Sequence, residues 1–155
     1  MGVHARSGDR LTEVKRSRFF AHTMSHPPRF PASKDQAGAY ARAVFESVDR
    51  MDAQAFGAWF SPRGSFVFGN AAPCVGPQEV AREVGRFFSA IRALRHELHE
   101  CWYCDGALVC RVSATYTRHD GSQLTLPAAT IWRGGEAGID DYRIYADLTP
   151  LFAPG

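Results

Sequence analysis

The spacing of apolar and polar residues divides the chain into a helical part followed by a strand-rich part. Small and apolar side chains recur at helical spacing over residues 35–50, and Ser33 or Asp35 can cap the start of that helix. Asp52 can cap a short second helix, whose apolar pattern continues to Phe60. The pattern therefore predicts two consecutive helices near the start of the folded region.

A short strand and a third helix follow. The run Ser65-Phe-Val-Phe68 predicts a strand. Helical spacing returns over 77–91, and Pro77 suits the first turn of this helix because its missing N–H is not needed there.

From Leu94 onward the pattern changes to strands separated by turn signals. The pairs Asp105-Gly106 and Asp120-Gly121 predict two-residue hairpin turns, and residues 134–137 predict a four-residue hairpin loop. Three helices followed by a four-stranded meander indicate an α+β fold.

These turns fix a strand register, and side chains alternate between the two faces of a sheet. The face expected to line a cavity mixes large apolar groups with a few polar ones. A single β-bulge would invert part of this face. Its members are Leu94, His96, Leu98, Trp102, Val109, Ser113, Thr115, Thr117, Leu124, Leu126, Ala128, Thr130, Trp132, Arg143, Tyr145 and Asp147.

Length and composition favour one globular domain, with an enzyme or a binding protein as the default function. The chain has 155 residues, 45% hydrophobic and 22% charged, which are ordinary globular values. A formal net charge of +2 is too small to indicate a nucleic-acid partner. No apolar run reaches the roughly 18 residues of a membrane span, and no apolar signal-peptide core follows the first basic residues. We therefore expect a cytoplasmic protein.

Residues 1–34 differ from the rest, because they are rich in Arg and Pro and show no sustained periodicity. They indicate a disordered or loosely docked extension ahead of a domain over 35–155. Met24 is an alternative start of the chain. A targeting peptide is the rival interpretation, and Asp9 and Glu13 count against it.

The expected inward face supplies candidates for acid/base chemistry. Asp147 is the leading candidate for a general base, because an apolar cavity raises the pKa of a carboxylate toward working pH. The alternative role is to cap the turn that follows it or to pair with an Arg. Arg143 would orient a substrate oxygen or form an ion pair, and Tyr145 would donate a proton or form part of the wall.

Two further polar residues are candidates, one on a strand and one in a loop. His96 would shuttle a proton, or would be a hydrogen-bonded core residue. Asn70 lies in a loop that suits either substrate contact or turn geometry. The expected substrate-binding wall is formed by Trp59, Phe66, Phe68, Phe87, Ser113, Thr115, Leu126, Ala128 and Trp132.

The cysteines and histidines do not indicate a metal or redox site. On a strand the sulfurs of Cys101 and Cys104 point to opposite faces, which excludes a disulfide between them. Cys101 and Cys110 fall opposite each other, and we expect two thiols there. His96 and His99 also face opposite ways. No phosphate-binding loop or nucleotide fingerprint is present, so no cofactor is expected.

Three stretches carry a family resemblance: AYARAVFESVDRMDAQAFGAWFSPRGSFVFGN, APCVGPQEVAREVGRFF and IDDYRIYADLTPLF. With the strands between them, residues 38–152 resemble the SnoaL-like family of the nuclear transport factor 2-like superfamily. The resemblance implies a cone in which a bent sheet wraps a long helix around a deep pocket. It also implies a homodimer through the outer sheet face. Members include polyketide cyclases, ketosteroid isomerases, dehydratases, epoxide hydrolases and non-enzymes, so the fold does not decide the function.

Two well-known chemistries of this superfamily lack their residues here. The ketosteroid isomerase apparatus needs a carboxylate where this chain has Phe68, a Tyr at Val44 or Phe45, and an Asp at Ala129 or Thr130. Steroid-type isomerisation by that apparatus is therefore not expected.

Limonene epoxide hydrolase uses a Tyr-x-Asn, an Arg-x-Asp and a last-strand Asp. This chain keeps Asn70 and Asp147, but the Arg-x-Asp positions fall on Ser113 and Thr115. The resemblance to SnoaL-type cyclases is better, because one pocket Asp with hydrogen-bonding partners can suffice there.

The leading hypothesis is a cofactor-independent cyclase, isomerase, dehydratase or hydrolase that acts on a mainly apolar carbonyl compound. A protein that binds a small molecule without turnover is the first alternative, and a structural or dimerisation module is the second.

Overall fold

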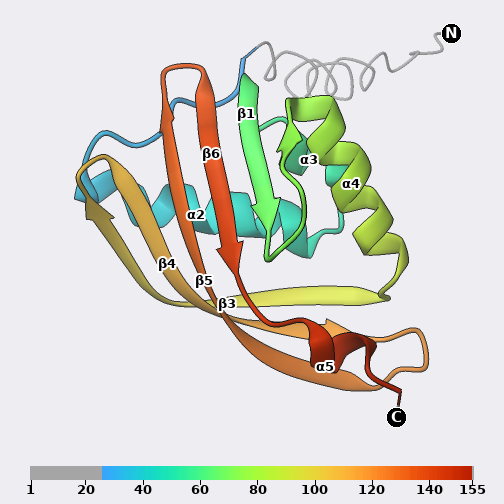
Figure 1. Ribbon diagram of the computed structural model, residues 1–155. Coiled ribbons are helices and arrows are strands. Elements are labelled where there is room, and N and C mark those ends of the chain that lie inside the picture. Colours follow the sequence, from blue (N-terminus) through green and yellow to red (C-terminus); the bar gives the residue numbers. More distant parts are fainter. Residues whose placement is uncertain (1–25, 155) are drawn as a thin grey trace, which may run out of the picture.

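The computed structural model describes residues 26–154, which form a curved six-stranded sheet with its three longer helices on the concave side (Figure 1). The helices are α2 (Lys34–Asp49), α3 (Ala53–Gly57), α4 (Pro77–Ser89) and α5 (Thr149–Phe152). The strands are β1 (Phe60–Phe68), β2 (Cys74–Val75), β3 (Ala93–Cys104), β4 (Ala107–Thr117), β5 (Gln123–Gly135) and β6 (Gly138–Tyr145).

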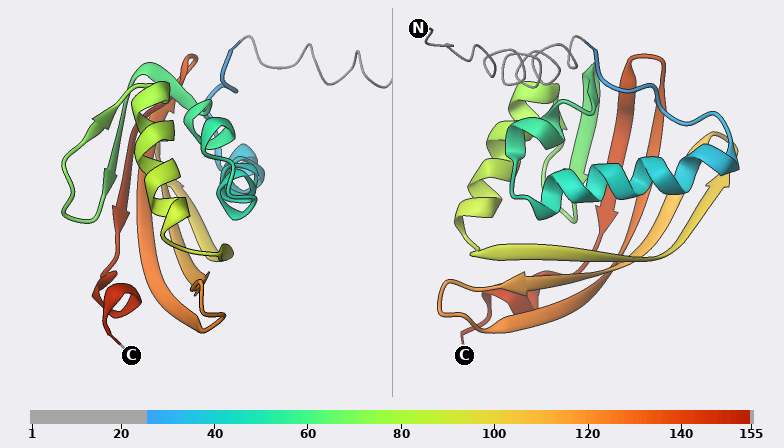
Figure 2. Two further views of the ribbon diagram at one scale, coloured as in Figure 1. Left: turned by 90° about the vertical axis from the view of Figure 1, so that its right-hand side faces the viewer. Right: turned by 180° about the vertical axis from the view of Figure 1, so that it is seen from behind.

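The sheet has the strand order β2-β1-β6-β5-β4-β3. Strand β1 pairs with β6 in parallel, and the other pairs are antiparallel. The four-stranded meander from β3 to β6 is as expected, and β1 extends it beyond the last strand. Figure 2 shows α2 running across the concave side of the bent sheet, with α4 beside it. The expected α+β cone is confirmed.

Local sequence signals explain where the helices begin and end. The Asp52 side chain accepts a hydrogen bond from the backbone N–H of Ala55 at 2.9 Å and so caps α3. Helix α3 ends at Gly57, and the prediction that it continues to Phe60 is wrong because β1 begins there. A Cβ at Gly57 would lie 2.5 Å from the carbonyl oxygen of Pro77, so only glycine permits this approach of α3 to α4.

The packed region begins before residue 35. Phe30 is 3% exposed and its backbone N–H donates to the carbonyl of Gly135 at 2.9 Å. Residues 26–34 therefore belong to the folded unit, and the expected boundary at residue 35 is too late for them. The rest of the expected extension, residues 1–25, lies outside the described residues.

The strand register of the meander differs from the prediction in β3, at the loop between β4 and β5, and near the end of β5. The Asp105-Gly106 turn forms as expected, with φ of 49° and 73°. A β-bulge between Leu98 and Glu100 then shifts the pairing of β3 with β4. The next loop has Thr117 opposite Gln123 in place of a two-residue turn, and β5 and β6 shift register near residue 134.

Because of these shifts, the residues of β4 and β6 that face the concave side are the opposite set to the predicted one. In β4 the buried positions are even-numbered, from Leu108 to Tyr116, and in β6 Tyr142 is buried while Arg143 is exposed. The expected inward residues on β5 are confirmed, as are Leu94, His96 and Leu98 on β3. The prediction was wrong for Trp102, Val109, Ser113, Thr115, Thr117, Arg143 and Tyr145, which alternation places on the outer face.

Aromatic side chains dominate the space between the sheet and the helices. The largest fully buried ones are Trp132, Tyr142, Phe56 and Phe60. Trp132 stacks on Tyr142 with ring centroids 4.5 Å apart, near the middle of the concave face. Of the helices in the described part of the chain, none is long and apolar enough to cross a membrane.

Candidate functional site

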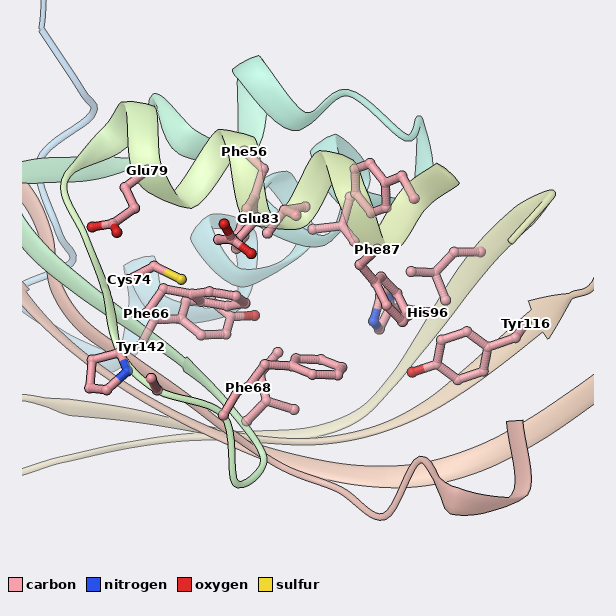
Figure 3. Close-up of a pocket in the computed structure, with 18 residues that line it drawn as sticks. Phe56, Phe66, Phe68, Cys74, Glu79, Glu83, Phe87, His96, Tyr116 and Tyr142 are labelled. Atoms are coloured by element: carbon pink, nitrogen blue, oxygen red, sulfur yellow. The ribbon is translucent and has the colours of Figure 1, made fainter. Parts of the chain in front are cut away.

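A cavity of about 440 Å³ lies between α4 and the concave face of the sheet (Figure 3). This volume falls within the range of small-molecule sites. Its mouth lies at the loop after β1, because Ala71, Ala72 and Pro73 line it and are exposed. The remaining lining residues are Val48, Phe56, Phe66, Phe68, Cys74, Glu79, Glu83, Val84, Phe87, Phe88, Leu94, His96, Tyr116, Tyr142 and Ile144.

Periodicity in two elements produces the opposing walls. On β1, Phe66 and Phe68 are two residues apart and point to the same face. On α4, Glu79 and Glu83 are four residues apart and share one side of the helix. Figure 3 shows both carboxylates directed from α4 toward the β1 wall, where Phe66 lies.

His96 and Asp49 form a hydrogen-bonded pair at the wall of the cavity. The ring Nδ1 of His96 lies 2.6 Å from Oδ1 of Asp49, and the backbone N–H of His96 donates to both carboxylate oxygens at 3.0 and 3.1 Å. Asp49 is the last residue of α2, and His96 lies in β3. The pair is largely shielded, with His96 13% and Asp49 27% exposed at their side chains. Phe45 stacks on the imidazole with ring centroids 4.9 Å apart.

This pairing determines which ring nitrogen is free. Because a carboxylate can only accept hydrogen bonds, Nδ1 carries the proton that points at Asp49. The neutral ring then keeps its lone pair on Nε2, the nitrogen that Asp49 does not hold. The Asp49–His96 pair is thus arranged as an oriented proton acceptor.

Two tyrosines place hydroxyl groups in the same cavity. Burial raises the pKa of Tyr116 to about 12 and the pKa of Tyr142 well above its ordinary value. Both hydroxyls therefore keep their protons at neutral pH and can donate hydrogen bonds. Tyr116 pairs with Leu94 across the β3–β4 ladder and His96 pairs with Ala114, so Tyr116 and His96 are diagonal neighbours on the inner face.

The His96 side chain also borders a second, more polar cavity of about 290 Å³. Arg42, Glu46, Asp49 and Glu97 supply the charges there. His96 thus lies between an aromatic cavity and a charged one, with Asp49 on the charged side.

The structure gathers only part of the predicted site. His96, Phe66, Phe68 and Phe87 line the cavity as expected. Asn70 is exposed in the loop beside the mouth and does not line it.

The prediction that Asp147 faces the cavity is wrong. The side chain is exposed and its Oδ1 accepts a hydrogen bond from the backbone N–H of Thr149 at 2.9 Å, so it caps the turn before α5. Hydrogen bonds from the Thr149 side chain and backbone lower its pKa, the opposite of the expected rise. Arg143 pairs with Asp141 at 3.0 Å on the outer face, and Tyr145 is 55% exposed. All three were misplaced by the register shifts.

The other predicted wall residues also lie outside the cavity. Trp59 contacts Tyr40 at 5.1 Å between ring centroids, and Trp132 is fully buried behind Tyr142. Leu126 and Ala128 face inward but contribute to the core. On the outer face, Oγ of Ser113 lies 2.7 Å from Nε2 of His99, and the side-chain oxygens of Thr115 and Thr125 lie 2.8 Å apart.

Sequence reasoning missed most of the polar groups that do line the cavity. Tyr116 and Tyr142 would have been found with the opposite phase of β4 and β6. That phase depends on the bulge between Leu98 and Glu100 for β4 and on the register shift between β5 and β6 for Tyr142. Asp49 meets His96 only through the tertiary fold. Glu79 and Glu83 resemble an ordinary solvated helix face in the sequence.

Cys101 and Cys110 lie opposite each other as expected, but the position of Cys74 in the cavity was not predicted. All four are free thiols, and Cys101 and Cys110 are cross-strand partners with sulfurs 3.7 Å apart. Cys74 lines the cavity, where burial first, and then Glu83 and Glu79, raise the pKa of its thiol. No group of three or more metal-ligating side chains occurs within residues 26–154.

A family model described as the SnoaL-like domain matches residues 41–138. The chain belongs to the SnoaL-like family. No curated protein sequence matches it.

Solved structures share this fold at low sequence identity. A Catenulispora acidiphila protein with a ketosteroid isomerase-like fold, in complex with trimethylamine, has a TM-score of 0.66 at 15% identity, covering 70% of this chain and 85% of that one. A SnoaL-like polyketide cyclase from a Jannaschia species has a TM-score of 0.65 at 13% identity, covering 81% and 99%. SalBIII, an epoxide hydrolase/cyclase-like enzyme of pyran ring formation in salinomycin, has a TM-score of 0.65 at 13% identity, covering 76% and 95%.

Proposed function

We propose that this SnoaL-like protein is a cofactor-independent acid/base enzyme that acts on a small, mainly apolar carbonyl compound held in the α4 cavity. The observation that carries the proposal is the Asp49–His96 pair at the cavity wall. Asp49 fixes the tautomer and orientation of the imidazole, as a carboxylate does in a catalytic dyad. His96 is the general base in place of the expected Asp147.

The proposed step moves one proton. A C–H bond next to the substrate carbonyl breaks, its proton passes to Nε2 of His96, and the electron pair is delocalised onto the carbonyl oxygen. The imidazolium that forms is stabilised by Asp49. The hydroxyl of Tyr116 stays protonated at neutral pH and donates a hydrogen bond to the enolate oxygen. Return of the proton to the far carbon of a conjugated enolate completes an isomerisation. Attack of the enolate carbon on a second carbonyl completes a cyclisation when the proton passes from His96 to the alkoxide that forms.

The similarity to SalBIII and to a SnoaL-like polyketide cyclase supports an enzyme of this general kind. The complex of the Catenulispora protein with trimethylamine supports the use of the pocket for a small molecule. Cytoplasmic location and a homodimer remain part of the proposal. The dimer would use the outer sheet face, where Trp102 is 48% exposed.

The test is deuterium exchange of protons next to a carbonyl in D₂O, followed by NMR over a panel of aryl and cyclic ketones. We expect His96→Gln and Asp49→Asn to slow exchange by about 10²-fold or more, the usual size of general-base effects. Ketones that bind without any exchange in the wild-type protein would contradict the proposal and favour a binding protein. Equal exchange in wild type and His96→Gln would remove His96 as the base.

A further inference from the structure

The two carboxylates on the cavity rim define the charge of the molecule that this site takes. We propose that the substrate is an apolar amine in its ammonium form, with the ammonium between Glu79 and Glu83 and the reacting carbonyl end at His96. This inference rests on the proposed function for the role of His96, and on the cavity lining alone for the ammonium.

The lining carries negative charge and no permanent positive charge. Glu79 and Glu83 are its two acidic members, and neither Lys nor Arg is among the lining residues. Their side chains are 42% and 36% exposed, so both remain at the mouth with the cavity on one side and water on the other. An anionic substrate would enter against these two charges.

Two arginines on α4 reduce this negative charge without removing it from the cavity. The guanidinium nitrogens of Arg82 lie 3.6 Å from a carboxylate oxygen of Glu79 and 3.6 Å from one of Glu83. A guanidinium nitrogen of Arg86 lies 2.9 Å from the same carboxylate of Glu83. Both arginine side chains are exposed, and neither lines the cavity. Surface pairs of this kind contribute little and are screened by salt. The Cys74 thiol inside the cavity still has a pKa raised by burial, then Glu83 and Glu79, more than Arg82 lowers it.

The walls next to these carboxylates are aromatic. Phe66, Phe68 and Phe87 line the space below and beside Glu83, with Phe68 and Phe87 ring centroids 5.4 Å apart. A cation over such ring faces is stabilised by their negative charge density, and most strongly when it is shielded from water. The same rings bind the apolar body of a ligand, so one wall serves both parts of an amphiphilic amine.

Figure 3 shows Glu79 and His96 toward opposite ends of the cavity, with Glu83 between them. In Figure 3, Glu79 and Cys74 lie at one end, and His96 and Tyr116 lie at the other. Phenylalanine side chains occupy the space between them. A ligand with a positive group at one end and a carbonyl at the other matches this distribution.

Three ketones of nearly one shape separate charge from size: (4-acetylphenyl)trimethylammonium, its neutral carbon isostere 4′-tert-butylacetophenone, and the anion 4-acetylbenzoate. Binding is measured by ligand-observed NMR titration of the full chain. We expect the cation to bind about tenfold more tightly than the neutral ketone, in line with a shielded cation–aromatic contact aided by carboxylates. The anion should bind most weakly, and added NaCl should weaken only the cation.

The double variant Glu79→Gln with Glu83→Gln should reduce the preference for the cation to about twofold and leave the neutral ketone unchanged. Glutamine keeps the acceptor that Glu79 offers to the backbone N–H of Val75 at 2.8 Å, and circular dichroism checks the fold. Glu100→Gln with Glu136→Gln is the matched control for net charge, because Glu100 pairs with Arg111 on the outer face and Glu136 pairs with Arg29 in the loop after β5. It should retain the full preference.

A neutral ketone that binds as tightly as the cation would overturn the inference. A preference that survives in Glu79→Gln with Glu83→Gln, or that disappears in Glu100→Gln with Glu136→Gln, would overturn it as well. These readouts need no turnover. Exchange of the acetyl protons in the same samples tests His96 separately, so failure of the ammonium site and failure of the acid/base function give different results.

Discussion

The aromatic residues on the concave side form two regions of similar composition that are packed in opposite ways. Near the start of α2, Tyr40 contacts Phe30 and Trp59 with ring centroids 5.4 and 5.1 Å apart, and its ring lies 6.5 Å from that of Trp132. This region is closed. Beside α4, the aromatic side chains line a cavity of about 440 Å³, among them Phe56, Phe66, Phe68, Phe87 and Tyr116.

Tyr142 is the boundary between the two regions, because it stacks on Trp132 and also lines the cavity. The closed region is completed by Phe30, which comes from the segment ahead of α2 and is 3% exposed. The concave side of the sheet is therefore aromatic in both regions. It forms a packed core where the segment ahead of α2 fills the space, and a candidate ligand site where the space stays open. Aromatic content alone does not distinguish the two.

The largest contrast is expected from truncating one aromatic residue in each region. Trp132→Ala removes a fully buried side chain and should lower the free energy of unfolding by about 3–5 kcal/mol. Phe68→Ala should lower it by only about 1 kcal/mol, because Phe68 already borders open space and part of its surface stays in water. Urea denaturation followed by circular dichroism measures both. Equal losses would show that the cavity is filled in solution.

A pair of glycine substitutions gives the next contrast. In the closed region, a Cβ at Gly134 would lie 2.4 Å from the carbonyl oxygen of Gly138 and 2.7 Å from the Phe30 ring, so Gly134→Ala should cost about 1–3 kcal/mol. In α4, a Cβ at Gly85 would meet only Ala53, at 3.7 Å. Gly85→Ala should therefore stabilise the helix by about 0.5–1 kcal/mol. Thermal unfolding measures both, and a stabilising Gly134→Ala would mean that the closed region is loosely packed.

The sequence was sufficient for the fold because the fold depends on many weak signals that agree. Helical spacing, the Asp52 cap, Pro77 and the Asp105-Gly106 turn each predicted an element that the structure contains. A bulge or an added loop residue hardly disturbs that agreement, since strand identity does not depend on strand phase.

The site was predicted poorly because it depends on strand phase and on contacts between distant residues. One bulge between Leu98 and Glu100 replaces Ser113 and Thr115 with Tyr116 on the inner face. The pairing of Asp49 with His96 spans 47 residues and leaves no local signal. His96 was placed correctly because it precedes the bulge in β3.

The smallest effect on activity is expected from substituting Asp147. Comparing it with Asp49 separates the two acidic residues that are candidates for a catalytic role. Asp147→Asn should leave the exchange of substrate protons unchanged within about twofold, whereas Asp49→Asn should slow it by about 10²-fold. Asp147 has a pKa lowered by its hydrogen bonds to Thr149, so the wild-type cap is present above the carboxyl pKa of the unfolded chain. It is lost as the pH falls through the lower folded value. The protection factor of the Thr149 amide against hydrogen exchange should therefore fall at acid pH in the wild type and lose that dependence in Asp147→Asn, because the amide of Asn does not titrate. A large loss of activity in Asp147→Asn would instead require the end of β6 to turn inward in solution, which would restore the strand phase that the structure excludes.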